Sequence, residues 1–250
     1  MAAVEQRIRK RDRIKARTRR FVELPLRLRT SDLPKRAASA AAMLLVAGTA
    51  LWLDGGWLDA FIALVAAACL AELIRLVRRA TPHPGFRTAG VVAGAIYVAM
   101  AALFLASIAP AFMLELVLGV VATDTGAYFA GRVIGGPKLA PRISPSKTWA
   151  GLIGGAVFAA LALAIEAALT AEADGSALLA VGAAAAFGVI IAVVAQSGDL
   201  LESWLKRKAK MKDSSNLIPG HGGVFDRVDG LVAVAFAVAV IGAPGLLDLW

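Results

Sequence analysis

Long runs of apolar residues recur along this chain, and each run approaches the length that crosses a lipid bilayer. A helix needs about 20 predominantly apolar residues to cross the hydrocarbon core. Hydrophobic residues occupy 59% of the 250 positions and charged residues only 18%. Soluble domains usually hold about 45–50% apolar and about 25% charged residues. The composition therefore excludes soluble globular, disordered and disulfide-scaffold classes, and it predicts an all-α, polytopic helical membrane protein.

About seven segments are predicted to form transmembrane helices, and most of them are rich in Ala, Leu and Val with scattered Gly. Small residues let helices approach closely in lipid. The first segment is short, and the boundary between the third and fourth segments, at Pro110, remains open. We expect a basic cytosolic arm at residues 1–30 and one membrane-embedded domain at residues 31–250. The predicted spans are residues 37–53, 57–74, 89–109, 112–131, 150–170, 177–198 and 228–247.

Basic residues are concentrated at the N-terminus. Residues 1–36 contain 13 of the 27 Lys and Arg and 4 of the 18 acids, so this segment carries the whole net charge of +9. A basic arm is typical of nucleic-acid binding, but no zinc motif or recognition helix accompanies it, and we expect no nucleic-acid partner. Two interpretations remain open: the arm rests on anionic lipid headgroups, or it is a disordered topology signal.

The loops between the predicted spans alternate in charge, and this alternation predicts the orientation of the protein. The positive-inside rule places basic loops in the cytosol, so the N-terminus is expected inside and the C-terminus outside. The longer polar loops at residues 132–149 and 199–227 then face the cytosol. We expect a protein of the cell (inner) membrane with an active site facing the cytosol. The five Trp lie at predicted helix ends, as in an interfacial aromatic belt: Trp52, Trp57, Trp149, Trp204 and Trp250.

The densest group of polar residues begins at the end of the sixth predicted span. Asp199, Glu202, Ser203, Lys206 and Lys210 recur at helical i, i+3, i+4 spacing, which predicts one polar stripe. Carboxylates together with phosphates suit Mg²⁺, and lysines suit phosphate. A juxtamembrane stripe that contacts lipid headgroups is the alternative interpretation. It would account for the basic residues but not for the acids.

A Gly-rich turn follows this stripe and leads into the last predicted span. Three glycines surround His221, which permits close approach of the backbone to a ligand. Successive N–H groups in such a turn can bind an anion. Asp226 and Asp229 then share one helical face, where charged groups need partners such as a cation. Helix capping by Asp226 is the alternative interpretation.

A second polar group lies in the fourth predicted span. Asp124 is expected about 10 Å inside this span, on the same face as Tyr128 and Gly131. An acid at this depth usually marks a functional site. A buried partner of Arg132 or Tyr128 is the alternative.

The loop after this span ends in a cluster of small hydroxyl residues. Ser144 is predicted to cap the fifth span, with Pro145 in the first helical turn. A helix N-terminus with nearby hydroxyls and Lys147 is also a candidate phosphate site.

At these residues the chain resembles the CDP-diacylglycerol synthases, also called phosphatidate cytidylyltransferases. The family signature runs Ser-x-Leu-Lys-Arg-x4-Lys-Asp-x-Ser-x3-Pro-x-His-Gly-Gly-x2-Asp-Arg-x-Asp, and residues 203–229 supply every fixed position. Residues 124–132 and 138–145 also look like the family. Two departures stand out, because Ser146 stands where the family usually has Lys, and Ala150 where it usually has Glu. The resemblance covers roughly residues 31–250, and these two departures leave Lys147 as the only charged residue of residues 144–150.

The resemblance implies a nucleotidyltransferase that converts CTP and phosphatidate into CDP-diacylglycerol and pyrophosphate. It implies Mg²⁺ as the cofactor and leaves open whether a second cation also binds. It implies metal binding by Asp199 and Asp226, with Asp229 and Asp124 as further candidates. Lys147 and other basic residues are implied as phosphate contacts, and His221 would contact pyrophosphate or carry a proton. The expected catalytic residues are Asp199, Lys206, Arg207, His221 and Asp226. The expected substrate-binding residues are Asp124, Ser144, Lys147, Thr148, Ser203, Lys212, Gly222, Gly223 and Arg227.

Two other functions remain open. A CTP-using polyprenol or dolichol kinase would share the helices and the CTP site but would release CDP. A transporter would gather its charges near the bilayer midplane at a repeat interface, whereas the charges here cluster at the predicted cytosolic border. The expected partners are the two substrates and membrane lipid, and a homodimer is compatible with the sequence. The predicted topology places the carboxylates of Asp124, Asp199 and Asp226 on one water-filled cavity that opens to the cytosol and to the lipid, with Asp199 and Asp226 within reach of a shared metal ion.

Overall fold

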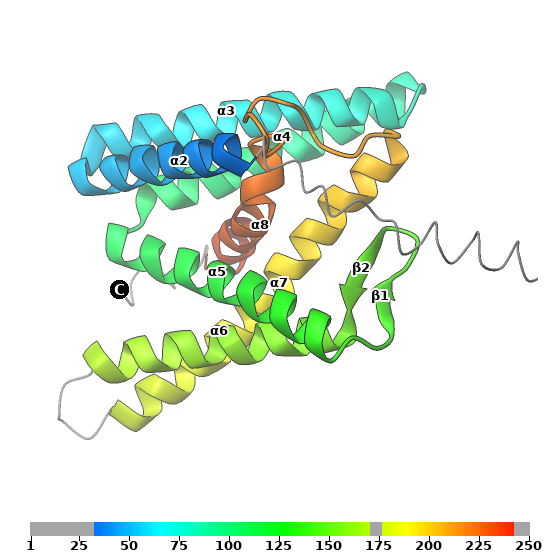
Figure 1. Ribbon diagram of the computed structural model, residues 1–250. Coiled ribbons are helices and arrows are strands. Elements are labelled where there is room, and N and C mark those ends of the chain that lie inside the picture. The colour runs from blue at the N-terminus through cyan, green and yellow to red at the C-terminus, as the bar shows by residue number, and fades with distance from the viewer. Residues whose placement is uncertain (1–32, 171–176, 243–250) are drawn as a thin grey trace, which may run out of the picture.

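The computed structural model describes residues 33–170 and 177–242, so the basic arm expected at residues 1–30 lies outside the described residues. The described residues form seven long helices and one antiparallel pair of strands (Figure 1). The mainly helical architecture is confirmed, while the strands were not expected. The helices are α2 (Leu33–Leu53), α3 (Gly55–Ala80), α4 (Pro84–Ser107), α5 (Pro110–Val133), α6 (Trp149–Thr170), α7 (Ala177–Lys208) and α8 (Phe225–Gly242). The strands are β1 (Lys138–Ala140) and β2 (Ser144–Thr148).

Each predicted span overlaps one described helix, but only five of the described helices are long and apolar enough to cross a membrane. These five are α3, α4, α5, α6 and α7. In α2 the apolar stretch is shorter, at Ala37–Leu53, and α8 has 18 residues with three charges near its start. The protein is therefore a helical membrane protein, and the count of seven spans remains a prediction.

Small residues determine how closely the helices pack. A Cβ atom at Gly126 of α5 would lie 2.5 Å from the carbonyl oxygen of Gly154 in α6. A Cβ atom at Gly188 of α7 would lie 2.6 Å from the carbonyl oxygen of Ala159, also in α6. Larger residues would separate these helices, because packing rather than hydrophobic force holds helices together in lipid.

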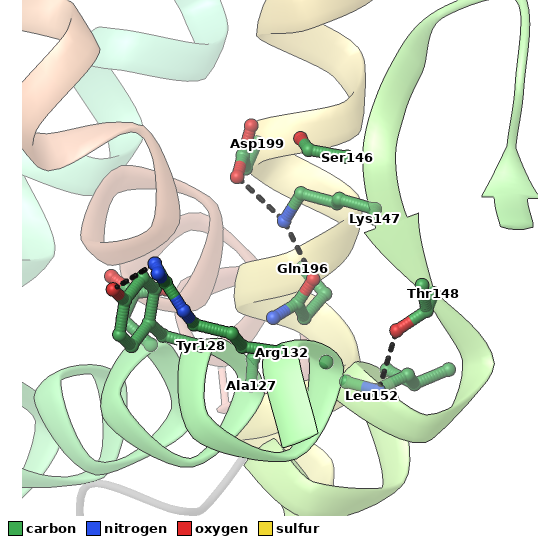
Figure 2. A pocket seen from close by; sticks show the side chains of 12 residues that line it. Ala127, Tyr128, Arg132, Ser146, Lys147, Thr148, Leu152, Gln196 and Asp199 are labelled. Carbon is green, nitrogen blue, oxygen red and sulfur yellow. Dashed lines mark hydrogen bonds and ion pairs between the residues drawn. The ribbon is translucent and has the colours of Figure 1, made fainter. Parts of the chain in front are cut away.

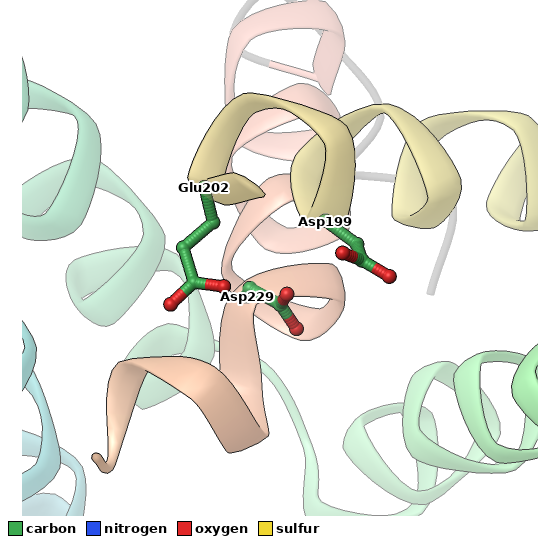
Figure 3. Close-up of side chains that lie close together, drawn as sticks. All are labelled: Asp199, Glu202 and Asp229. Carbon is green, nitrogen blue, oxygen red and sulfur yellow. The ribbon is translucent and has the colours of Figure 1, made fainter. Parts of the chain in front are cut away.

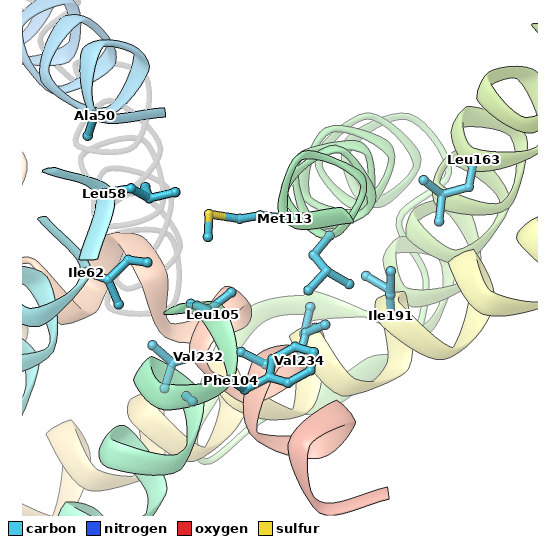
Figure 4. Packing of buried hydrophobic residues seen from close by; sticks show 14 residues of the cluster. Ala50, Leu58, Ile62, Phe104, Leu105, Met113, Leu163, Ile191, Val232 and Val234 are labelled. Atoms are coloured by element: carbon cyan, nitrogen blue, oxygen red, sulfur yellow. The ribbon is translucent and has the colours of Figure 1, made fainter. Parts of the chain in front are cut away.

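Helix α8 lies in the middle of the bundle, where it packs against α3, α4, α5 and α7. One cluster of buried apolar side chains extends from Ala50 in α2 through Leu105 in α4 and Met113 in α5 to Val234 in α8 (Figure 4). The start of α8 is the part of this helix that carries acids. Its central position therefore fixes those acids relative to four neighbouring helices.

The basic connections gather at one end of the bundle. The β1–β2 hairpin, the α3–α4 connection and the loop from α7 to α8 lie at the right of Figure 1, while the α2–α3 and α4–α5 connections lie at the left. This arrangement agrees with the predicted alternation of loops. The assignment of the hairpin end to the cytosol remains a prediction.

The expected cap of the helix that follows the hairpin was wrong. Ser144 lies in β2, opposite Ala140 of β1, and α6 begins only at Trp149. The hydroxyl oxygen of Thr148 instead accepts a hydrogen bond from the backbone N–H of Gly151, at 3.0 Å. A Ser-Pro pair is typical of a helix start, but here pairing with β1 extends the strand up to Thr148.

Candidate active site

Two cavities at the hairpin end of the bundle adjoin one another. Their volumes are about 370 and 310 Å³, and Asp124 of α5 and Asp199 of α7 line both of them. The hairpin cavity is lined by Asp124, Ala127, Tyr128, Gly131, Arg132, Ser146, Lys147, Thr148, Gly151, Leu152, Gln196 and Asp199. The acidic cavity is lined by Asp124, Ala195, Asp199, Glu202, Lys206, Asp213, Asp226, Arg227, Asp229 and Gly230.

Lys147 joins the hairpin to α7 across the hairpin cavity (Figure 2). Its ammonium nitrogen lies 2.5 Å from Oδ2 of Asp199 and donates to Oε1 of Gln196 at 2.6 Å. On the opposite wall, Nη1 of Arg132 donates to the hydroxyl of Tyr128 at 2.9 Å. The cavity thus holds two cationic side chains whose present partners are a carboxylate, an amide and a phenol.

Three carboxylates converge in the acidic cavity (Figure 3). Asp199 and Glu202 of α7 and Asp229 of α8 each offer one oxygen within 4.8 Å of the other two. Glu202 is 1% exposed, and its Oε1 has no hydrogen-bond partner among the described residues. Clustered acids with an unpartnered buried oxygen fit a cation, and all-oxygen ligands suit a hard divalent ion such as Mg²⁺.

A glycine explains why these acids meet. A Cβ atom at Gly198 would lie 2.4 Å from the Cβ atom of Ala233 and 2.8 Å from the carbonyl oxygen of Asp229. Helices α7 and α8 therefore pack closely beside Asp199. Without the glycine, the carboxylates of the two helices would lie farther apart.

Asp226 lines the same cavity but is held by other groups. Its Oδ1 accepts a hydrogen bond from Lys206 at 2.8 Å, and its Oδ2 accepts bonds from the N–H groups of Ser214 and Gly223, both at 2.9 Å. Burial alone would raise the pKa of the Asp226 carboxyl, but the hydrogen bonds outweigh burial, and the pKa lies below its ordinary value. Asp226 is therefore ionised at neutral pH and anchors the loop that precedes α8.

Lys206 connects the two groups of acids. Its ammonium nitrogen lies 2.5 Å from Oε2 of Glu202 and 2.8 Å from Oδ1 of Asp226. One cation thus bridges a member of the carboxylate cluster and the anchor of the loop.

Comparison with known sequences shows the family to which the segment that forms these cavities belongs. Residues 110–243 match the profile of the cytidylyltransferase family, and they include every residue that lines either cavity. This match covers more than half of the chain. The chain belongs to the cytidylyltransferase family.

Individual members of the cytidylyltransferase family give a closer comparison. A phosphatidate cytidylyltransferase of Brucella suis is 50% identical over 121 residues, which are 48% of this chain and 43% of that protein. The phosphatidate cytidylyltransferase of Haemophilus influenzae is 48% identical over 115 residues, 45% of this chain and 38% of that protein. The phosphatidate cytidylyltransferase of Pseudomonas aeruginosa is 43% identical over 123 residues, which are 49% of this chain and 44% of that protein. The matched segment therefore spans less than half the length of these relatives.

The structure of this member of the cytidylyltransferase family brings together about half of the residues predicted from the sequence. Asp124, Asp199 and Asp226 all line the acidic cavity, as expected, although their roles remain predictions. The predicted residues that line one or both cavities are Asp124, Lys147, Thr148, Asp199, Lys206, Asp226, Arg227 and Asp229. Those that line neither cavity are Ser144, Ser203, Arg207, Lys212, His221, Gly222 and Gly223.

Several residues outside the cavities support those inside them. Ser203 donates a hydrogen bond to Oδ1 of Asp199 at 3.2 Å. Arg207 donates to the carbonyl oxygen of Ile143 at 3.1 Å and so ties α7 to the hairpin. Nδ1 of His221 lies 2.8 Å from the hydroxyl oxygen of Ser39 in α2. These predicted catalytic or substrate-binding residues hold structural contacts.

The Gly-rich loop and the basic residues before it are placed differently from expectation. The stripe predicted to reach Lys210 ends earlier, because α7 stops at Lys208 and Lys210 adopts a left-handed φ of 55°. Lys212 is exposed. Gly222 has φ +89°, and a Cβ atom there would lie 2.9 Å from Oδ2 of Asp226. In the described structure the loop wraps around Asp226 rather than lining a cavity.

Two of the cavity-lining residues that sequence reasoning missed contact predicted lysines. Glu202 was counted in the polar stripe of α7 but was not named as a ligand, although its i+3 spacing from Asp199 places both on one face. Gln196, three residues before Asp199, is buried and accepts a bond from Lys147. The helical spacing that gave the stripe would have identified both.

Proposed function

We propose that this protein transfers the cytidylyl group of CTP to phosphatidate, giving CDP-diacylglycerol and pyrophosphate. The observation that carries the proposal is the pair of adjoining cavities, in which a carboxylate cluster and Lys147 share Asp199. The match to the cytidylyltransferase family and the names of the relatives support the same reaction.

The chemistry of this reaction sets what the site must do. An oxygen of the lipid phosphate attacks the α-phosphorus of CTP, and a new P–O bond forms. The bond from the α-phosphorus to the bridging oxygen breaks, and its electron pair leaves with pyrophosphate. Because the attacking oxygen is already anionic, it needs little help from a general base. The obstacle is repulsion between two polyanions, so catalysis rests on neutralising and aligning phosphates.

The acidic cavity requires additional positive charge before a triphosphate can enter. Six acids and only two basic residues line it, so an anion would be repelled from the cavity as it stands. We propose that Asp199, Glu202 and Asp229 hold a divalent cation such as Mg²⁺. When bound, this ion supplies charge neutralisation and alignment of phosphate oxygens. Asp199 and Asp229 are thus retained from the sequence prediction, and Glu202 joins them.

Asp226 remains a candidate ligand in this proposal. Its Oδ1 can bind a cation only when Lys206, which now donates a hydrogen bond to it, binds another anion instead. Lys206 would find that anion in a substrate phosphate. The ion pair between Lys206 and Asp226 would then be a resting arrangement that substrate binding replaces.

Lys147 and Lys206 are the proposed phosphate contacts. In the structure Lys147 pairs with Asp199, and Lys206 pairs with Glu202 and Asp226. Each lysine loses a carboxylate partner when that carboxylate takes a cation, and its ammonium group then becomes available to a phosphate oxygen. Cation binding and phosphate binding should therefore be coupled.

The location of the cavities fits the solubilities of the two substrates. CTP is soluble in water, while phosphatidate keeps its acyl chains in the bilayer, so their phosphates must meet near the headgroup level. The hairpin cavity is lined by residues of β2, and the acidic cavity by Asp213 of the α7–α8 loop and by the start of α8, so both adjoin the basic connections. We propose that the end of the bundle with these connections faces the cytosol at the inner membrane.

Product analysis tests the proposed function. Purified protein in detergent, given CTP, phosphatidate and Mg²⁺, is expected to release pyrophosphate in equal amount to CDP-diacylglycerol. Release of CDP would instead indicate transfer of the γ-phosphate, as in a lipid kinase. Absence of both products with a full supply of Mg²⁺ would contradict the proposal.

A further inference from the structure

A buried acid of α3 lies behind the Gly-rich loop, outside both cavities. Glu72 is 5% exposed and belongs to a helix long and apolar enough to span the membrane. A carboxylate in this position is unfavourable unless other groups satisfy it. Within the part of the chain that the structure describes, the three ion pairs involve other acids, so Glu72 relies on hydrogen bonds.

Among the described residues, all four hydrogen bonds to Glu72 come from residues 214–225. Its Oε1 accepts from the hydroxyl of Ser215 at 2.5 Å and from the N–H of Val224 at 3.0 Å. Its Oε2 accepts from the hydroxyl of Ser214 at 2.8 Å and from the N–H of Phe225 at 2.8 Å. Each oxygen therefore binds one hydroxyl and one backbone N–H, which satisfies the carboxylate.

Glu72 acts as a helix cap supplied by another helix. Val224 directly precedes α8, and Phe225 is its first residue. N–H groups at this end have no partner within the helix, and the helix dipole favours an anion. A local cap would come from a side chain of the same segment. Gly223, directly before Val224, has none.

The close approach of Glu72 also explains the glycine at position 223. A Cβ atom at Gly223 would lie 2.5 Å from Oε2 and 2.7 Å from Oε1 of Glu72. It would also lie 1.9 Å from the hydroxyl oxygen of Ser214. Any larger residue would expel either the serine or the glutamate.

The loop residues that Glu72 holds are the ones that hold Asp226. The hydroxyl of Ser214 lies 3.0 Å from Oδ2 of Asp226 as well as 2.8 Å from Glu72. The N–H groups of Ser214 and Gly223 donate to the same Asp226 oxygen. A continuous chain of contacts thus runs from Glu72 through the loop to Asp226 and on to Lys206.

We propose that Glu72 is a positioning residue for the reaction, and this inference rests on the proposed function above. It fixes the start of α8 and thereby the placement of Asp226 and Lys206 in the acidic cavity. Glu72 lies outside residues 110–243, which match the family profile. The groups that prepare the site therefore extend into the N-terminal half of the chain.

The test compares Glu72→Gln with Glu115→Gln, which changes an acid of α5 that lines neither cavity. For Glu72→Gln, kcat per folded protein is expected to fall about 100-fold, with KM for CTP unchanged, as when only the transition state loses an interaction. Deuterium uptake in peptides covering residues 213–226 should rise. Neither measurement should change in Glu115→Gln.

Two results would overturn the proposal. A lowered melting temperature with wild-type kcat per folded protein would make Glu72 a purely structural cap. A reduced kcat with wild-type deuterium uptake would mean that Glu72 does not act through the loop.

A second variant covers the case in which Glu72→Gln does not fold. Ser215→Ala removes one of the four bonds to Glu72, and it should raise uptake in the same peptides and lower kcat by a smaller factor. Wild-type uptake and kcat in Ser215→Ala would overturn the proposal. Because uptake is measured without substrate, it tests the loop even if the wild-type protein makes no CDP-diacylglycerol, a result that would refute the proposed reaction alone.

Discussion

The hairpin cavity and the acidic cavity share a wall but differ in charge. The hairpin cavity has two acids and two basic residues in its lining, together with apolar groups such as Leu152. The acidic cavity has six acids and two basic residues. The charges in the first balance, while the second becomes able to accept an anionic group only with a cation. This difference in charge favours cation binding in the acidic cavity. Asp199 lies on the shared wall, so we expect the function of both cavities to depend on it.

The largest effect is expected from Asp199→Asn, because this change removes a carboxylate from both cavities. Loss of a cation ligand and of the Lys147 partner should lower kcat about 1000-fold in a pyrophosphate-release assay. The matched control is Asp59→Asn, which neutralises an exposed acid of α3. Near-normal turnover of Asp199→Asn at saturating Mg²⁺ would show that the cavities do not share a functional residue.

Lys147→Gln should have the next largest effect, since it removes a cation from the hairpin cavity only. We expect about a 100-fold loss of kcat/KM, the size typical of a lost electrostatic contact in the transition state. The amount of Mg²⁺ bound should stay the same, because the carboxylate cluster is intact. Lys138→Gln, at an exposed position of β1, serves as the control. Equal losses of kcat/KM in both variants would mean that Lys147 acts only as a general surface charge.

Gly198→Ala tests whether the crossing of α7 and α8 forms the cation site. The added methyl group meets Ala233 and the backbone of Asp229, and such overpacking usually destabilises by about 1–3 kcal/mol. Mg²⁺ affinity, measured by titration, should fall, and Ala233→Gly in the same protein should restore part of it. Unchanged affinity in Gly198→Ala would indicate that the three carboxylates do not act as one site.

The smallest effect is expected from Ser146→Lys, which adds a lysine at a position where the family usually has one. Ser146 lines the hairpin cavity, so a second cation there should lower KM for an anionic substrate about two- to fivefold, as for a partly exposed charge pair. Ser146→Gln controls for side-chain size. An increase in KM for Ser146→Lys would mean that this wall faces a cation rather than a phosphate.

The helices and the main acids could be predicted because their signals are local in sequence. Apolar runs mark the helices, and the grouping of Asp199, Lys206 and Asp226 within residues 196–230 marks the acidic cavity. The hairpin was missed because its strands have three and five residues. Strands this short do not show a clear alternation of apolar and polar residues. Pairing with β1, rather than any property of Ser144, decides that this residue is in a strand.

Glu72 could not be predicted to approach the loop, because its partners lie far away in sequence. Its bond to Ser214 joins residues 142 positions apart. Nothing in the apolar run around Glu72 distinguishes it from an acid at a span border. The packing of α3 against α7 and α8 brings the two segments together. Long-range contacts of this kind follow from the fold and are not encoded in a local pattern.

The most direct test of this account is the position of a bound divalent ion. We would determine a crystal structure with CTP and Mn²⁺ in place of Mg²⁺, and locate the ion by its anomalous scattering. The account predicts one peak between the carboxylates of Asp199, Glu202 and Asp229, with a CTP phosphate close to Lys147 or Lys206. A peak elsewhere in the bundle, with these three carboxylates unligated, would contradict it.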